Sequence, residues 1–140
     1  MSTETLADFP ARASDKLRYG DTDAQGHVNN AVFSTFLETA RTELLYAAAE
    51  GDEAILDPDC GFVIVRLELD YVAEVLWPGS VDMGTRVVKV GSSSVTLDQT
   101  VFQADKVVAR ARSVMVQVNL ASRKPQALSE RAKARLEALI

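Results

Sequence analysis

The sequence predicts a single α+β domain in which one long helix packs across an antiparallel sheet. Residues 30–50 have apolar side chains at spacings of three and four, which is the period of a helix. Four later segments are β-rich and are joined by short connections, which favours antiparallel hairpins. Such a sheet has one apolar face that must be covered, and a helix packed across it buries both apolar surfaces.

The N-terminal part of the chain is expected to lie outside the domain. Residues 1–14 are small and polar with little periodicity, so they are expected to form a flexible tail, with the domain covering residues 15–140. A short strand is expected over residues 16–19. The next segment, residues 20–26, is rich in turn-forming residues and is expected to form a loop that leads into the helix.

The predicted helix over residues 30–50 has signals at both ends. Asn29 or Asn30 can cap its start by accepting a hydrogen bond from a free backbone amide, and Gly51 suits its end. The loop over residues 52–61 cannot continue the helix because of its Asp-Pro-Asp run. The apolar face of the helix consists of Phe33, Phe36, Leu37, Ala40, Leu44, Ala47 and Ala48.

Residues 62–72 have the alternation of a half-buried strand, with apolar side chains on one face and charged side chains on the other. The apolar set is Val63, Val65, Leu67, Leu69 and Tyr71, and the charged set is Arg66, Glu68 and Asp70.

The rest of the chain is predicted to add three strands and a short C-terminal helix. The strands are expected over residues 80–90, 94–104 and 107–120, separated by connections of a few residues. The helix is expected over residues 129–140, with Ser129 as its N-terminal cap.

The composition limits the class of protein. At 140 residues and 47% hydrophobic, the chain can bury a core without disulfides or metal. Charges interrupt every apolar stretch well before the roughly 20 residues needed to cross a bilayer, so no stable membrane insertion is expected. The N-terminal residues lack the basic start and apolar run of a secretory signal, which favours a cytoplasmic location.

Charge and special residues exclude further classes. A formal charge of -5 argues against nucleic-acid binding. Basic residues gather in the C-terminal third, where Arg123 and Lys124 can meet an anionic ligand or form a solvated face. Cys60 is the only cysteine, so no intramolecular disulfide can form. His27 is the only histidine, and a zinc site would depend on carboxylates, so we predict no metal and no cofactor.

A dense run of polar residues lies between the expected first strand and the helix start. It contains Asp21, Asp23 and, six residues after Asp23, Asn29. A helix start offers unpaired N–H groups and the positive end of the helix dipole, which suits a developing oxyanion. A tight loop can bring the carboxylate of Asp23 beside those amides, so this run is expected to carry the chemistry.

The run resembles the signature of the hotdog acyl-CoA thioesterases of the 4-hydroxybenzoyl-CoA thioesterase type, Asp-x-Asp-x-x-Gly-His-Val-Asn-Asn. The resemblance covers residues 16–128 and includes Phe36, Glu38 and Arg41 of the predicted helix. In this sequence the signature consists of Asp21, Asp23, Gly26, His27, Val28, Asn29 and Asn30.

The resemblance implies a hotdog fold, in which a curled antiparallel five-stranded sheet wraps around a long central helix. It also implies a homodimer or homotetramer with each active site at a subunit interface. The implied reaction is hydrolysis of an acyl thioester, of coenzyme A or of an acyl carrier protein, to a carboxylic acid and a free thiol.

The resemblance also implies roles for individual residues. Asp23 matches the catalytic carboxylate, which acts as nucleophile or as the base that orients water. The backbone N–H of Asn30, with Ala31 next to it, matches the group that polarises the thioester carbonyl, where one aligned donor contributes roughly 3–4 kcal/mol. His27 and Ala31 are candidate substrate-binding residues. Arg123 and Lys124 are candidate contacts for the substrate phosphates.

Other interpretations of these residues stay open. Asp23 alone could be a turn residue, which is the commonest use of Asp in such loops. His27 could position Asp23 or only hydrogen-bond the loop. Glu38 is the alternative carboxylate, because another hotdog lineage places this group on the helix. Phe33 stands where the family often has Tyr, which removes a hydroxyl. Cys60 paired with His27 lacks the local context that activates a thiol.

Two other functions are open at the level of the whole protein. A non-catalytic acyl-CoA-binding or regulatory hotdog protein would keep the pocket without depending on Asp23. A hotdog dehydratase would require a His and acid pair in a different motif.

Overall fold

A computed structural model describes residues 4–48 and 54–140 of the chain. Residues 49–50, the expected end of the long helix, and Gly51 lie outside the described residues. The elements in chain order are η1 (Leu6–Asp8), β1 (Ala11–Lys16), η2 (Tyr19–Asp21), α1 (Val32–Ala48), β2 (Cys60–Tyr71), β3 (Ser80–Val90), β4 (Ser94–Gln103), β5 (Lys106–Asn119) and α2 (Glu130–Glu137).

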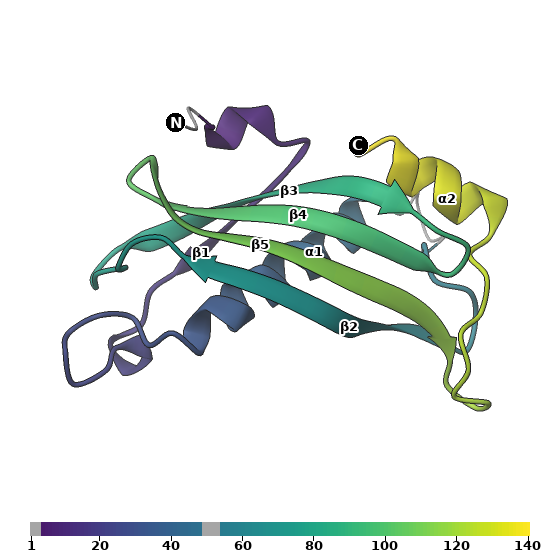
Figure 1. The fold of residues 1–140 in the computed structure, drawn as a ribbon, viewed down its shortest axis with the longest axis horizontal. Helices are drawn as coiled ribbons and strands as arrows, with labels where there is room; N and C mark the ends of the chain where they lie inside the picture. The colour runs from purple at the N-terminus through teal and green to yellow at the C-terminus, as the bar shows by residue number, and fades with distance from the viewer. Residues whose placement is uncertain (1–3, 49–53) are drawn as a thin grey trace.

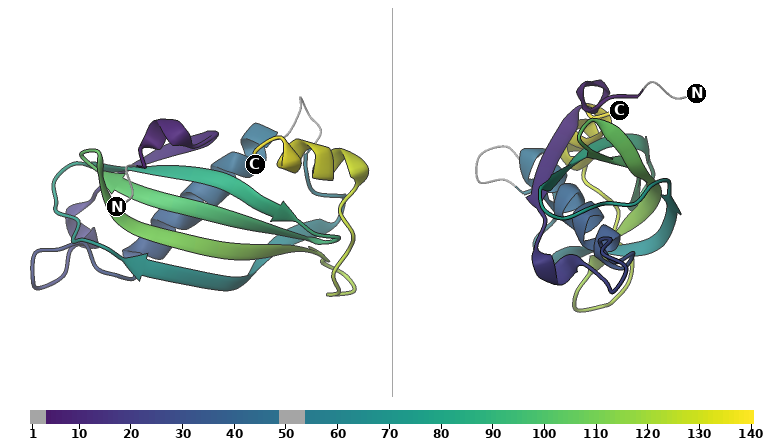
Figure 2. Two further views of the ribbon diagram at one scale, coloured as in Figure 1. Left: turned by 45° about the horizontal axis from the view of Figure 1, so that its top comes forward. Right: turned by 90° about the vertical axis from the view of Figure 1, so that its left-hand side faces the viewer.

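The strands form one five-stranded antiparallel sheet in the order β1-β3-β4-β5-β2. The sheet curls around α1, which lies across its concave face (Figure 1; Figure 2, right). The predicted hotdog arrangement is therefore confirmed. No helix among the described residues is long and apolar enough to span a membrane.

The later elements lie where the sequence predicts them. The bounds of β3, β4 and β5 agree with the prediction to within one residue. The side chain of Ser129 accepts a hydrogen bond from the Ala132 N–H at 3.0 Å, which is the expected cap of α2.

The first strand differs from the prediction. β1 pairs with β3 from Ala11 opposite Thr85 to Lys16 opposite Ser80, so the tail expected over residues 1–14 is wrong for residues 11–14. The strand expected over residues 16–19 is correspondingly displaced. Alanines facing α1 leave β1 without the bulky apolar alternation that identifies a strand.

The residues before β1 lie on the outer face of the sheet. Phe9 is only 2% exposed, and its ring packs edge-on against Phe102 at a centroid distance of 6.2 Å. It covers Gly84 so closely that a Cβ atom there would overlap the ring. The guanidinium of Arg86 lies 4.4 Å above the same ring.

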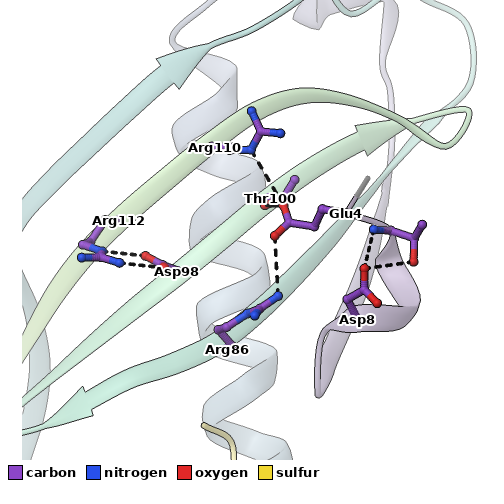
Figure 3. A network of polar contacts seen from close by, with 8 residues as sticks. Glu4, Asp8, Arg86, Asp98, Thr100, Arg110 and Arg112 are labelled. Carbon is purple, nitrogen blue, oxygen red and sulfur yellow. Dashed lines mark hydrogen bonds and ion pairs between the residues drawn. The ribbon is translucent and has the colours of Figure 1, made fainter. Parts of the chain in front are cut away.

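Glu4 adds a polar attachment beside this apolar one (Figure 3). Its carboxylate accepts a hydrogen bond from the Thr100 hydroxyl at 2.8 Å and lies 3.6 Å from Arg86 and 3.8 Å from Arg110. Residues Glu4 to Phe9 therefore form a strap across β3, β4 and β5.

β2 is an edge strand with a β-bulge. Its pairing with β5 shifts between Ile64 and Arg66, so Val65 has no residue opposite. Ile64 lies opposite the buried Met115, and Leu67 lies opposite the buried Ser113. Residues opposite each other in an antiparallel pair share a face, so the bulge changes which residues point inward. The inward set is Phe62, Ile64, Leu67, Leu69 and Tyr71.

The expected apolar face of β2 is therefore wrong before the bulge. Val63 lies opposite Val116 on the outer face, and Val65 is the inserted residue. The strand is also more exposed than a half-buried strand, with Val65 at 59% and Ile64 at 45%, because it stands at the open edge.

The core between α1 and the sheet has two apolar clusters with a polar layer between them. Gln99 Nε2 donates to the carbonyl of Leu37 at 3.1 Å and to the hydroxyl of Thr85 at 3.2 Å, and its Oε1 accepts from Arg41 at 3.4 Å. Burial lowers the pKa of Arg41, and nearby Glu38 opposes that effect. Phe36, Met83 and Val101 lie on one side of this layer and belong to the first apolar cluster. Leu44, Val87 and Leu97 lie on its other side and belong to the second.

Candidate functional site

The segment between η2 and α1 closes into a tight loop around Asp23. The Asp23 N–H donates to the carbonyl of His27 at 2.8 Å, and the Gly26 N–H donates to the carbonyl of Asp23 at 3.1 Å. Gly26 has a φ of 83°, in the left-handed region that favours glycine. An isolated β-bridge joins Thr22 to Val28 and closes the base of the loop.

The loop holds one oxygen of the Asp23 carboxylate. Oδ1 accepts hydrogen bonds from the main-chain N–H groups of Gln25 at 2.8 Å and His27 at 3.3 Å. Among the described residues, no group donates to Oδ2. The carboxylate is thus fixed at one oxygen and leaves the other for a ligand.

A cleft of about 460 Å³ is lined by Asp23. It lies between the Asp23 loop, the start of α1 and the chain that continues from the end of β2. The lining residues are Asp23, Gln25, His27, Val28, Asn30, Phe33, Tyr71, Val72, Ala73 and Glu74.

Just before α1, a residue that lines the cleft has a main-chain N–H without a partner among the described residues. Asn29 Oδ1 accepts from the N–H of Ala31 at 3.0 Å, and the Asn29 carbonyl accepts from Val32 at 2.9 Å. The N–H of Asn30 donates to no residue in the described part of the chain. Of the two amides considered from the sequence, that of Asn30 is available, whereas that of Ala31 is engaged by Asn29 and Ala31 does not line the cleft.

Tyr71 is a cleft residue that sequence reasoning assigned only to the apolar face of a strand. Its hydroxyl donates to the carbonyl of Asn30 at 3.1 Å, and its ring meets Phe33 edge-on at 5.2 Å. A tyrosine hydroxyl is therefore present beside Phe33, although it comes from β2 rather than α1. No local pattern in the sequence indicates this contact.

Glu74 was also missed by sequence reasoning. Its Oε2 lies 2.7 Å from Nε2 of His27 in the same cleft. The two residues are far apart in the sequence and meet because the isolated bridge between His27 and Leu76 joins their segments. Only the tertiary fold brings them together.

Arg123 and Lys124 are not brought to this cleft. They follow Asn119, which lies opposite Cys60 at the far end of the β2–β5 pair, whereas the cleft adjoins Tyr71 at the near end. At about 3.3 Å per residue, the two ends are on the order of 30 Å apart. In Figure 1 the loop that follows β5 and the loop that precedes α1 lie at opposite ends of the sheet. Contact with one ligand would require a second copy of the chain.

The alternative catalytic groups lie outside the cleft. Glu38 is exposed on α1 and does not line it. Cys60 lies at the other end of β2, and burial, followed by Asp57 and Asp59, raises the pKa of its thiol. Within one chain, the structure therefore supports neither Glu38 as the catalytic carboxylate nor a Cys60 thiol paired with His27.

Comparison with known proteins finds similarity to thioesterases in both sequence and structure. A model of the thioesterase-like superfamily matches residues 17–136. The acyl-CoA thioester hydrolase YbgC of Escherichia coli is 28% identical over 125 residues, covering 89% of this chain and 90% of that protein.

Solved structures show the same fold. The PA5185 protein of Pseudomonas aeruginosa has a TM-score of 0.83 at 28% identity, covering 96% of this chain and 94% of that one. A thioesterase from Thermus thermophilus, solved in complex with coenzyme A and Zn, has a TM-score of 0.78 at 31% identity, covering 91% of this chain and 98% of that one.

Proposed function

The chain belongs to the thioesterase-like superfamily, and from this premise we propose that it hydrolyses an acyl thioester of coenzyme A to a carboxylic acid and a free thiol. One observation carries the proposal: the free oxygen of Asp23 and the unpaired N–H of Asn30 belong to residues that line one cleft. These two groups suffice for thioester hydrolysis, because a carboxylate can act on the carbonyl carbon while a donor stabilises the carbonyl oxygen.

Asp23 acts through Oδ2 in either of two routes. As a nucleophile, Oδ2 attacks the carbonyl carbon and the C–S bond breaks, which releases the thiolate and leaves a mixed anhydride that water then hydrolyses. As a general base, it accepts a proton from water while the water oxygen attacks the same carbon. In both routes Oδ1 stays bound to the two main-chain N–H groups, so the attacking oxygen keeps its direction.

The N–H of Asn30 stabilises the negative charge that develops on the thioester oxygen. One such donor contributes roughly 3–4 kcal/mol to the stabilisation of a transition state. The Tyr71 hydroxyl holds the carbonyl of Asn30, which belongs to the peptide unit after this amide. Tyr71 and Phe33, whose rings meet edge-on, give the cleft an apolar wall.

The working form is a homodimer or homotetramer. β2 is an open edge whose side chains at Val63, Ile64 and Val65 are exposed, and the residues after its end line the cleft. A second copy on this edge would cover these side chains and complete the cleft wall. Arg123 and Lys124 would then meet the substrate phosphates only if the second copy presents them. An acyl carrier protein is a second substrate class for the same chemistry.

The proposal is tested by release of free thiol from a panel of acyl-CoA and acyl carrier protein thioesters. Asp23→Asn is expected to lower kcat by about 10²-fold or more, because it removes the reacting charge. Asparagine keeps an oxygen for the Gln25 and His27 N–H groups, so the loop and acyl-CoA binding are expected to persist.

Asp21→Asn is the matched control. Asp21 lies two residues away and accepts a hydrogen bond from the Arg18 N–H at 2.9 Å, which asparagine can also accept. Its turnover is expected to stay within a few-fold of native. A native protein that binds acyl-CoA without releasing thiol, or an Asp23→Asn variant with native turnover, would contradict the proposal.

A further inference from the structure

We propose that Glu74 is a positioning residue of this thioesterase site, which orients the His27 imidazole so that its Nδ1 faces the reaction. The inference rests on the proposed function and adds a residue that no sequence motif contains. Its basis is the 2.7 Å contact between Glu74 Oε2 and His27 Nε2 in the cleft that Asp23 also lines.

The contact determines where His27 carries a proton. A carboxylate presents only lone pairs, so a bare imidazole nitrogen at this distance would be repelled. Nε2 therefore carries a hydrogen, and Nδ1 is the nitrogen that is left to exchange or accept a proton. No group in residues 4–48 and 54–140 bonds to Nδ1, so it is available to water or substrate.

The main chain links His27 directly to the reacting carboxylate. The His27 N–H donates to Asp23 Oδ1 at 3.3 Å, and the His27 carbonyl accepts from the Asp23 N–H at 2.8 Å. The Asp23 carboxylate is held by these bonds, so the orientation of the nearby His27 imidazole depends on the rotation of its own side chain. Glu74 restricts that rotation through its contact with Nε2.

The segment that carries Glu74 is itself held in place. The Val28 N–H donates to the carbonyl of Val75 at 2.8 Å, and an isolated bridge pairs His27 with Leu76. The Gln103 side chain accepts from the Leu76 N–H at 3.1 Å and donates to its carbonyl at 2.8 Å. These two hydrogen bonds attach the segment to the end of β4, so the main chain near Glu74 is held in place.

The pair is too exposed to be a main source of stability. The side chains of His27 and Glu74 are 37% and 54% exposed, and exposed ion pairs add little to folding. Replacing Glu74 is therefore expected to leave the fold intact. An effect on turnover would reflect His27, not unfolding.

The first measurement reads the imidazole directly. His27 is the only histidine, so tag-free protein labelled at histidine nitrogens gives one imidazole in the NMR spectrum. Native protein is expected to show the proton held on Nε2, and Glu74→Ala to show the mixed pattern of a free imidazole. Glu74→Gln keeps an oxygen that accepts from Nε2–H and is expected to retain most of the native pattern.

The second measurement is a double-mutant cycle on acyl-CoA turnover. Glu74→Ala is expected to lower kcat about tenfold with a smaller effect on KM, and His27→Ala to lower it by at least as much. Because Glu74 acts through His27, the double variant is expected to be no slower than His27→Ala. Glu68→Ala, which removes an exposed ion pair with Arg66 on β2, is the control and is expected to leave turnover unchanged.

The outcomes separate this inference from the proposed function. A Glu74→Ala variant with native kcat, an unaltered His27 spectrum, or losses that add fully in the double variant would overturn the role of Glu74 while leaving Asp23 in place. Absence of thiol release from the native protein would instead overturn the proposed function.

Discussion

Gly84 on β3 has no room for a side chain, because the ring of Phe9 occupies the space above its Cα atom. Phe9 in turn packs against Phe102 and lies beneath the Arg86 guanidinium. The missing side chain at one position thus lets the strap, residues Glu4 to Phe9, lie close to the sheet. Glycine is required here by close approach and not by backbone conformation.

Gly84→Ala is expected to lower the free energy of unfolding by about 1–3 kcal/mol, because the added methyl overlaps the Phe9 ring. Urea denaturation measures this loss. In a Phe9→Ala background the overlap with the ring is removed and only the Cβ of residue 9, at 3.0 Å, stays close, so the same substitution is expected to cost clearly less.

Gly20→Ala is the control for that experiment, since a Cβ atom at Gly20 meets no atom within 4 Å. Equal losses at Gly84 and Gly20, or an unchanged loss at Gly84 without the Phe9 ring, would refute the packing explanation.

At the scale of elements, β2 combines two properties that seldom occur together in a stable monomer. It is an edge strand with no strand paired to its outer side among the described residues, and it exposes several apolar side chains. Exposed apolar edges tend to pair with other chains. The bulge at Val65 lies in the middle of this edge and rotates the residues before it.

Val65→Glu is expected to shift the protein from dimer or tetramer to monomer, because two acidic side chains would be buried where the edges of two copies meet. Light scattering after size-exclusion chromatography gives the mass. Ile140→Glu makes a comparable change at a site that is 68% exposed and distant from β2, and it is expected to leave the mass unchanged. A native protein that is monomeric at all concentrations would refute the proposed assembly.

The elements with strong local signals could be predicted from the sequence. β-rich segments with short connections identified β3, β4 and β5, and Ser129 identified the start of α2. β1 was displaced because small residues suffice against α1, and the face of β2 was wrong because one inserted residue reverses the alternation.

Only those residues of the candidate site that lie in one short sequence motif could be predicted. The motif indicated Asp23 and Asn30 as site residues, and both line one cleft. Tyr71 and Glu74 reach the cleft from the chain around the end of β2, and only tertiary contacts reveal them. Arg123 and Lys124 were chosen from charge alone, which contains no information on distance along a sheet.

At the scale of the whole molecule, the polar layer under α1 separates two apolar clusters. Gln99 is its centre, since it bonds to the Leu37 carbonyl, the Thr85 hydroxyl and the Arg41 guanidinium. Buried polar groups are costly when unpaired, so each member depends on the others. We therefore expect the layer to help position α1 along the sheet, and with it the start of α1 beside the Asp23 loop.

Gln99→Leu is expected to lower the free energy of unfolding by about 2–3 kcal/mol, because it leaves the buried Arg41 charge and the Leu37 carbonyl without this partner. Thermal and urea unfolding measure the loss. Thr85→Val removes a single neutral hydroxyl and is expected to cost about 1 kcal/mol. Equal stability of native protein and Gln99→Leu would show that the layer does not hold the helix.

The two main-chain bonds to Asp23 Oδ1 have a practical consequence. They do not need a negative charge, so an amide at this position is expected to preserve the shape of the loop while it removes the charge proposed to react. A protein altered in this way is expected to cleave a bound thioester far more slowly than native protein. Crystals of that altered form, soaked with candidate acyl compounds, would reveal the natural acyl group by direct observation.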